Sequence, residues 1–83
     1  MPKVVFKTEY GNIKELNLSK NQIIELEARV FLSLPMLKIL NASNNKLKYI
    51  SGKIENCKQL ECLILDKNDL QMLPLEIGRL KFL

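Results

Sequence analysis

Apolar residues recur along this chain in a phrase of 14 positions that occurs three times. The phrase occupies residues 13–26 (IKELNLSKNQIIEL), 37–50 (LKILNASNNKLKYI) and 60–73 (LECLILDKNDLQML). All three copies fit the template LxxLxLxxNxLxxL when isoleucine is accepted for leucine and Ala42 fills one position. The central asparagines are 24 and then 23 residues apart. A fixed period in this range predicts stacked units that bury their apolar faces against one another.

A short alternation inside each phrase predicts a β-strand. Leu16 and Leu18 should point to one side of the chain and the residues between and beside them to the other. The rest of each unit supplies the dozen or more residues that a parallel crossover needs. Burying a leucine contributes roughly 1.5–3 kcal/mol, so columns of apolar residues should hold the stack together. The predicted columns are Leu16, Leu40 and Leu63; Leu18, Ala42 and Leu65; Ile23, Leu47 and Leu70; and Leu26, Ile50 and Leu73.

The second half of each unit carries a further apolar triplet. The segments after Pro35 and Pro74, such as LEIGRLKFL, have helical spacing for about two turns and predict short helices or 3₁₀ turns. Ala42 and Cys57 stand where larger residues are expected, so we expect the middle unit to pack least tightly unless its neighbours move in. The triplets are Phe31, Leu34 and Leu37; Ile54, Cys57 and Leu60; and Ile77, Leu80 and Leu83.

An asparagine occupies the same place in each phrase, directly after the predicted strand. There the backbone leaves its ladder, and unpaired amide and carbonyl groups would cost about 1–3 kcal/mol each if buried. The asparagine side chain carries both a donor and an acceptor. We therefore expect Asn21, Asn45 and Asn68 to lie inside the stack and to bond to the backbone, in preference to binding a ligand.

The template resembles that of the leucine-rich repeats, and the match covers residues 13–83. The resemblance implies an α/β solenoid, a leucine-rich repeat arc of three stacked units. Short parallel β-strands would line its concave face, and short helices or 3₁₀ turns its convex face. VFLSLPML in the first unit is similar to the 24-residue variety of extracellular repeats, whereas LPLEIGRL in the third is similar to the 23-residue variety of intracellular Ras-signalling scaffolds. This mixture leaves the subfamily open.

The same register predicts the organisation of the chain. The three units span residues 13–36, 37–59 and 60–83. Residues 1–12 are either an N-terminal cap or part of a preceding repeat, since Phe6 and Tyr10 match apolar positions of the later triplets. We expect a fragment of a longer array in preference to a complete module. Open ends of such a stack expose strand edges, so self-association is also expected.

Strand residues that do not enter the core should form an open grid on the concave face. Ile39, Cys62 and Ile64 would make an apolar patch within a charged border, as partner surfaces are commonly built; the preference of isoleucine for strands is the alternative explanation. By resemblance, such arrays are protein-recognition scaffolds. The predicted function is therefore non-catalytic binding of a partner protein through this face, in intracellular signalling. The predicted partner-binding residues are Lys14, Glu15, Asn17, Ser19, Lys20, Lys38, Ile39, Asn41, Ser43, Asn44, Glu61, Cys62, Ile64, Asp66 and Lys67.

Charge keeps two alternatives open. The formal net charge is +4, and the basic excess lies in residues 37–59, which hold five lysines and Glu55. A nucleic-acid-associated protein is one alternative, although it would need those lysines on one face and the chain offers only 2 tyrosines and no tryptophan for stacking. The other alternative is a truncated piece of a larger receptor or regulatory protein, without independent activity.

Other classes of function find little support in the residues. The chain has no histidine for a serine–histidine or cysteine–histidine pair, its 3 glycines are scattered, and Asp66 with Asp69 provides too few oxygen ligands for calcium. We expect no enzyme activity, cofactor or metal. No stretch approaches the roughly 18 apolar residues of a membrane span, and a cytoplasmic location is expected. Cys57 should lie in the core and Cys62 on the strand surface, so they should not be bridged.

Overall fold

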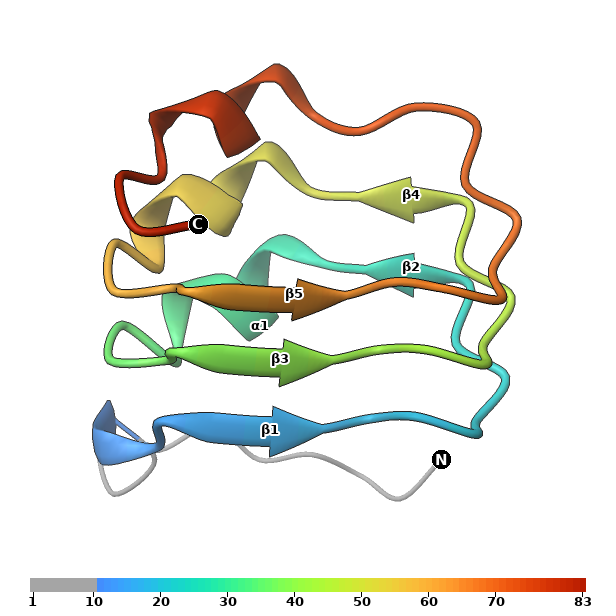
Figure 1. Cartoon of the computed structure of the whole chain (residues 1–83), viewed down its shortest axis with the longest axis horizontal. Helices are drawn as coiled ribbons and strands as arrows, with labels where there is room; N and C mark the ends of the chain where they lie inside the picture. The colour runs from blue at the N-terminus through green and yellow to red at the C-terminus, as the bar shows by residue number, and fades with distance from the viewer. Residues whose placement is uncertain (1–10) are drawn as a thin grey trace.

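The computed structural model describes residues 11–83, and three short strands lie side by side in it. The strands are β1 (Glu15–Asn17), β3 (Ile39–Asn41) and β5 (Cys62–Ile64), and they pair in parallel in the order β1-β3-β5 (Figure 1). Their register places Leu16 opposite Leu40 and Leu40 opposite Leu63. The predicted parallel pairing and the first predicted column are therefore confirmed.

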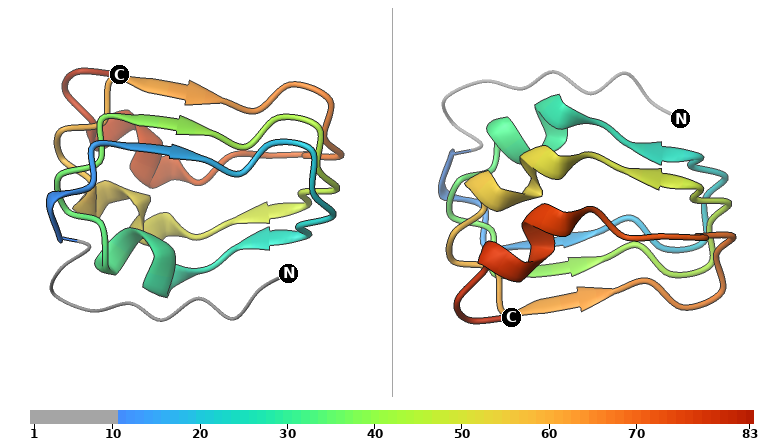
Figure 2. Two further views of the ribbon diagram at one scale, coloured as in Figure 1. Left: turned by 90° about the horizontal axis from the view of Figure 1, so that it is seen from below. Right: turned by 90° about the horizontal axis from the view of Figure 1, so that it is seen from above.

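After each of these three strands the chain continues into an extended stretch, which we call the ascending segment, and then into a short helical segment that leads to the next unit. β2 (Glu25–Leu26) and β4 (Tyr49–Ile50) form a second, two-stranded parallel sheet. The helical segments are α1 (Ala28–Leu32) and the 3₁₀ helices η2 (Gly52–Asn56) and η3 (Leu75–Arg79). Figure 2 shows these helical segments stacked on the side of the molecule opposite β1, β3 and β5. The predicted short helices and 3₁₀ turns are thus confirmed.

The sequence predicted a helical segment after Pro35, but the helix of the first unit lies before this proline. α1 ends at Leu32, before Pro35, and the chain after Pro35 leads directly into β3. A proline disfavours the helical conformation of the residue before it, here Leu34, so the helix ends upstream. η3 follows Pro74 as predicted, because a proline tolerates the start of a helical segment.

Pro74 removes one hydrogen bond that a third strand of the second sheet would need. The N–H of Ser51 donates to the carbonyl of Leu26 at 2.9 Å and closes the pairing of β2 with β4. Pro74 occupies the position of the third unit that corresponds to Ser51. It has no N–H to offer the carbonyl of Ile50, so this rung of the ladder cannot be repeated.

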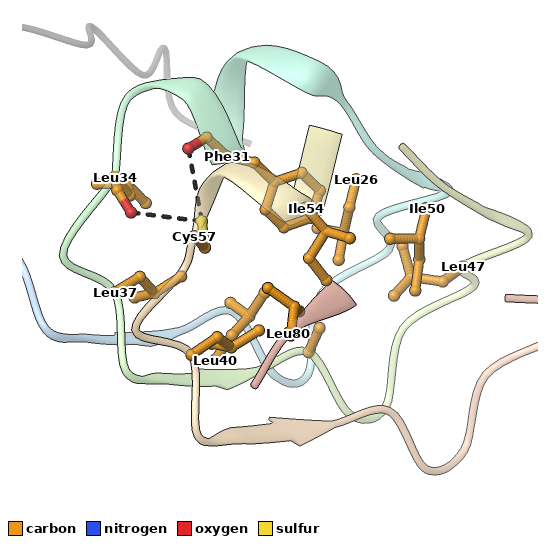
Figure 3. Close-up of a cluster of buried hydrophobic side chains, with 12 residues drawn as sticks. Leu26, Phe31, Leu34, Leu37, Leu40, Leu47, Ile50, Ile54, Cys57 and Leu80 are labelled. Atoms are coloured by element: carbon orange, nitrogen blue, oxygen red, sulfur yellow. Dashed lines mark hydrogen bonds between the residues drawn. The ribbon is translucent and has the colours of Figure 1, made fainter. Parts of the chain in front are cut away.

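The apolar core runs through the middle unit (Figure 3). Ala42 and Cys57 have exposed fractions of 0%, so both are fully covered, which is the exception that the prediction of a loosely packed middle unit allowed. The middle unit has a neighbour on each side, and these neighbours close over its smaller residues. The Sγ of Cys57 lies 3.5 Å from the carbonyl oxygen of Phe31 and 3.4 Å from that of Leu34. The buried core residues are Leu26, Phe31, Leu34, Leu37, Leu40, Ala42, Leu47, Ile50, Ile54, Cys57, Leu60 and Leu80.

The columns are less covered in the third unit. Leu73 and Leu83 have exposed fractions of 48% and 46%, although both belong to predicted apolar positions. Leu65 and Leu70 are half-buried. Leu65 and Leu70 pack against the buried core of the stack, whereas Leu73 and Leu83 remain exposed. The apolar columns are therefore only partly covered in the third unit.

The repeated asparagines join one unit to the next. Asn45 donates from Nδ2 to the carbonyls of Leu18 and Ala42, both at 3.0 Å, and to that of Ser43 at 3.1 Å. Its Oδ1 accepts from the N–H of Ile23 at 3.1 Å. Asn45 is therefore bonded to backbone groups of both the first and the middle unit, as its donor and acceptor groups predicted.

Asn68 repeats this arrangement one unit later, whereas Asn21 departs from the prediction. Asn68 donates to the carbonyls of Ala42 and Leu65 and accepts from the N–H of Leu47 at 3.0 Å. Asn21 is exposed, and its described bonds go only to Leu18 and Ser19 of its own unit. The prediction that all three asparagines lie inside is therefore wrong for Asn21. The predicted cap or partial repeat at residues 1–12 falls almost entirely outside the described residues.

A left-handed backbone residue precedes each repeated asparagine, a feature that the sequence did not reveal. Lys20, Asn44 and Lys67 have φ angles of 59°, 55° and 57°. Asparagine adopts this conformation more readily than lysine does, so Asn44 was the one available signal. The left-handed residue turns the chain three residues after each strand ends, so lysine and asparagine produce the same corner in all three units.

Replacing Asn45 by alanine should destabilise the stack far more than replacing Asn21. Asn45→Ala leaves several buried backbone groups without partners and should lower the free energy of unfolding by about 3 kcal/mol or more. Asn21→Ala should cost about 1 kcal/mol or less, because water can replace its exposed bonds. Urea unfolding followed by circular dichroism measures both values. Equal losses would show that the link between units does not depend on Asn45.

The two cysteines should differ sharply in reactivity. Burial raises the pKa of the Cys57 thiol from 9.0 to about 11, whereas Cys62 is exposed, and both are free thiols. Because the thiolate is the nucleophile, iodoacetamide should modify Cys62 in the folded protein and Cys57 only on unfolding. Peptide mapping by mass spectrometry after timed labelling distinguishes the two. Fast labelling of Cys57 under native conditions would contradict the packing described above.

The same raised pKa predicts a loss of stability at alkaline pH. Above pH 9 the thiol of Cys57 ionises in the unfolded chain but stays protonated in the folded one until about pH 11. Its contribution is therefore fully present below pH 9 and is lost as the pH rises through that interval, by about 2–3 kcal/mol. Urea unfolding of the natural chain and of Cys57→Ala at several pH values measures the difference. A gap between them that does not change with pH would contradict this prediction.

Candidate functional site

The candidate site is the strand face, which we define as the surface formed by the fifteen predicted partner-binding residues on and beside β1, β3 and β5. Nine of them are exposed and five are half-buried. Ser43 is the exception: it is 6% exposed, and its hydroxyl donates to Oδ1 of Asn41 at 2.7 Å. Ser43 is therefore not an accessible contact residue. The half-buried members are Ser19, Lys38, Asn41, Asn44 and Ile64.

The strand face rests on a backbone ladder that is longer than the strands themselves. Lys38 donates its N–H to the carbonyl of Lys14 at 2.7 Å before the strands begin, and Lys20 donates to the carbonyl of Ser43 at 3.1 Å after they end. The same pattern continues to the third unit, where Asn44 donates to the carbonyl of Asp66 at 3.0 Å. The side chains of the face are thus held at fixed positions on a hydrogen-bonded frame.

Three apolar residues meet on the strand face, as the sequence predicted, and we call them the apolar centre. Ile39 pairs in register with Cys62, and Ile64 follows Cys62 at the next position on the same side of β5. Ile39 is 36% exposed, Cys62 is exposed and Ile64 is half-buried. The apolar centre therefore spans β3 and β5 and presents aliphatic surface and one free thiol to the solvent.

Charged side chains surround the apolar centre unevenly. On the first and middle units the face carries Lys14, Lys20, Lys38 and Glu15, a net charge of +2. On the third unit it carries Glu61, Asp66 and Lys67, a net charge of −1. Nζ of Lys38 lies 3.9 Å from Oε2 of Glu61, with both side chains substantially exposed, so this pair contributes little to stability. An electrostatic gradient therefore runs along the stack, with its positive part over β1 and β3.

Two Asn-x-Ser triplets form matching turns on the strand face, a feature that sequence reasoning missed. Oδ1 of Asn17 accepts from the N–H of Ser19 at 2.9 Å and from its hydroxyl at 2.6 Å. Oδ1 of Asn41 accepts from the same two groups of Ser43, at 3.1 and 2.7 Å. Asn17 and Asn41 are also partners in the register of β1 and β3. Their recurrence at one position of the template was the signal that could have revealed the arrangement.

The structure does not gather the basic residues of the middle unit into one site. Lys38 lies on the strand face, Lys46 and Lys48 lie on the ascending segment, and Lys53 belongs to η2. Lysines that surround a coil in this way cannot contact one phosphate backbone together. Within residues 11–83 there is also no group of three histidine, cysteine, aspartate or glutamate side chains placed to hold a metal ion. Among the helices of the same residues, none has the length and apolar character to cross a membrane.

Comparison with protein-family models gives one finding, which agrees with the geometry. The model described as leucine rich repeat matches residues 11–70 of the 83-residue chain. The matched segment contains β1, β3 and β5, the asparagines that join the units and the whole strand face. Domains of this family are commonly modules for protein–protein interaction and are typically non-enzymatic. With its period, its parallel strands and its asparagine bonds in agreement, this chain belongs to the leucine-rich repeat family.

Proposed function

We propose that this chain is a non-catalytic interaction module that binds a partner protein through the strand face. The observation that carries the proposal is the apolar centre: Ile39, Cys62 and Ile64 lie together, accessible to solvent, within a border of charged residues. An apolar core with a polar rim is the common arrangement of protein interfaces. None of these three side chains belongs to the buried core of the stack.

The frame under the apolar centre favours recognition. Leu40 and Leu63 anchor β3 and β5 from the core side, while the residues on either side of them point outward. A backbone that is already held by this frame loses little conformational freedom on binding, which reduces the entropic cost of association. The strand face can therefore be specific without changing its shape.

The dimensions of the strand face set the size of the contact. The three ladder segments, each about seven residues long because the hydrogen bonds continue beyond the strands, lie about 4.8 Å apart and cover on the order of 300 Å². A standard protein interface buries about 800 Å² on each partner. The strands described here therefore match a short segment of a partner, or the central part of a larger contact that extends over neighbouring surfaces.

The finer features of the proposal follow from the repeat pattern. We assign the three units to residues 13–36, 37–59 and 60–83, and the strand face to the concave surface of the arc. The exposed thiol of Cys62 fits a reducing compartment, so we place the protein in the cytoplasm, as part of a signalling assembly.

Lysine placed in the apolar centre should abolish partner binding and leave the fold intact. The chain, used as bait, captures a partner, which is then purified for titration calorimetry. Ile39→Lys and Ile64→Lys should each weaken binding by about 30-fold or more, the effect of losing a residue that dominates an interface. Ile24→Lys is the matched control, because Ile24 is 56% exposed and lies outside the strand face.

Thermal unfolding of the three variants verifies that each is folded. Binding should weaken only moderately between low and moderate salt, whereas contacts to many phosphates would make it fall steeply. If the two strand-face variants bind the partner as tightly as the Ile24→Lys control, the partner contacts another surface and the proposal is wrong.

A further inference from the structure

We propose that Asn17 and Asn41 form a subsite for a carboxylate group of the partner, an inference that rests on the strand face being the contact surface. Both residues stand on the outward side of adjacent strands, with Asn17 exposed and Asn41 half-buried. They pair in register, so their side chains leave the sheet next to one another. The subsite lies beside the apolar centre, because Asn41 is the register partner of Ile64.

The serine residues determine which way each amide faces. Oδ1 of Asn17 accepts from the N–H of Ser19, and Oδ1 of Asn41 accepts from the N–H of Ser43. A backbone N–H can only donate, so the atom that it meets must be the amide oxygen and not the nitrogen. The serine hydroxyls bond to the same two oxygens. Each Nδ2 group therefore points away from its serine, and neither donates a hydrogen bond to any other residue among 11–83.

Because Asn17 and Asn41 are register partners, their amide groups stand about one strand spacing apart, which suits one ligand group held between them. Neighbouring strands lie about 4.8 Å apart, and an N–H···O hydrogen bond spans about 2.9 Å. A group with two acceptor oxygens can thus accept one hydrogen bond from each Nδ2. A carboxylate provides this pair of oxygens on a single carbon, whereas a lone carbonyl offers one oxygen for both donors.

Electrostatics favour a charged acceptor at this place. Lys14, Lys20 and Lys38 outnumber Glu15 on this half of the strand face, and a hydrogen bond to a charged acceptor is roughly twice as strong as a neutral one. In the third unit the register continues with Ile64, and Asp66 takes the place of the serine. The third unit therefore offers no matching amide donor and no net positive charge, so an anion should bind over β1 and β3.

The neighbouring apolar centre indicates what carries the carboxylate. Ile39 lies between Glu15 and Cys62 in the register, and Ile64 lies beside Asn41. An aliphatic stem attached to the carboxylate would contact these side chains. A glutamate side chain and an aliphatic residue at a chain terminus both provide such a stem, and the test separates them.

Butyrate is the simplest probe, since it combines a carboxylate with a short aliphatic stem. The ¹⁵N-labelled chain is titrated with sodium butyrate at constant ionic strength, and the side-chain amide signals of Asn17 and Asn41 are followed by NMR. Saturable shifts of these signals are expected. Butyramide has the same stem without the charge, and the same titration should give it an affinity at least tenfold lower than that of butyrate. Absence of saturable shifts with butyrate, or equal affinity for butyramide, would overturn the proposal.

Matched variants separate the subsite from the overall charge. The double variant Asn17→Asp with Asn41→Asp keeps the oxygen that accepts from each serine and replaces each Nδ2 donor by an anionic oxygen. It should abolish the effect of butyrate. Gln22→Glu with Gln71→Glu makes the same change of charge at exposed positions outside the strand face and should respond like the natural chain. Retained butyrate binding in the aspartate variant overturns the proposal.

Two peptides identify the source of the carboxylate. One is acetyl-Ala-Ala-Leu with a free carboxyl terminus, and the other is acetyl-Ala-Glu-Leu amide. Tighter binding of either one supports the subsite and assigns the source, and binding of neither overturns it. The purified partner then distinguishes the two proposals: if Ile64→Lys abolishes binding and the aspartate variant does not, the strand face stands and the carboxylate subsite fails. If neither variant weakens binding, both proposals fail.

Discussion

The structure depends on the hydrogen bonds of Asn45 and Asn68, the asparagines that follow β3 and β5 and join neighbouring units. Asn45 bonds to the carbonyl of Leu18 in one unit and to that of Ala42 in its own, and its oxygen accepts from Ile23. Leucine columns attract units to one another without specifying their position along the strand, because the hydrophobic effect has no direction. The asparagine bonds do have direction. They place each unit in one register, and that register determines which residues become neighbours on the opposite side of the sheet.

The strand face is available because the leucines and the asparagines stabilise other parts of each unit. Side chains such as Leu40 and Leu63 stabilise the stack from one side of the sheet, and the asparagines stabilise its corners. The residues on the other side of the same strands contribute little to folding and are available for contact with another molecule. Their arrangement is nevertheless fixed, since the ladder positions Ile39 beside Cys62 and Asn41 beside Ile64. A surface that is rigid and not required for stability is well suited to carry a specific interaction.

The middle unit shows how stacking changes the environment of a residue. Ala42 and Cys57 are small for their positions, yet both are completely buried, whereas Leu73 in the third unit is 48% exposed. Burial therefore follows the number of neighbouring units more closely than the size of the side chain. The same effect separates Asn45, which is buried and bonded to two units, from Asn21, which is exposed and bonded to its own.

The amino-acid sequence by itself determined the period, the parallel strands, their register and the short helical returns, because these follow from the spacing of leucine and asparagine within each unit. It also identified Ile39, Cys62 and Ile64 as neighbours, since equal positions in successive repeats must lie side by side. Only the tertiary structure decided the burial of Ser43, the left-handed residues Lys20 and Lys67 and the outward direction of the Asn17 and Asn41 amides. These features depend on hydrogen-bond geometry and on the cover that adjacent units provide, neither of which is encoded in a pattern of apolar and polar positions.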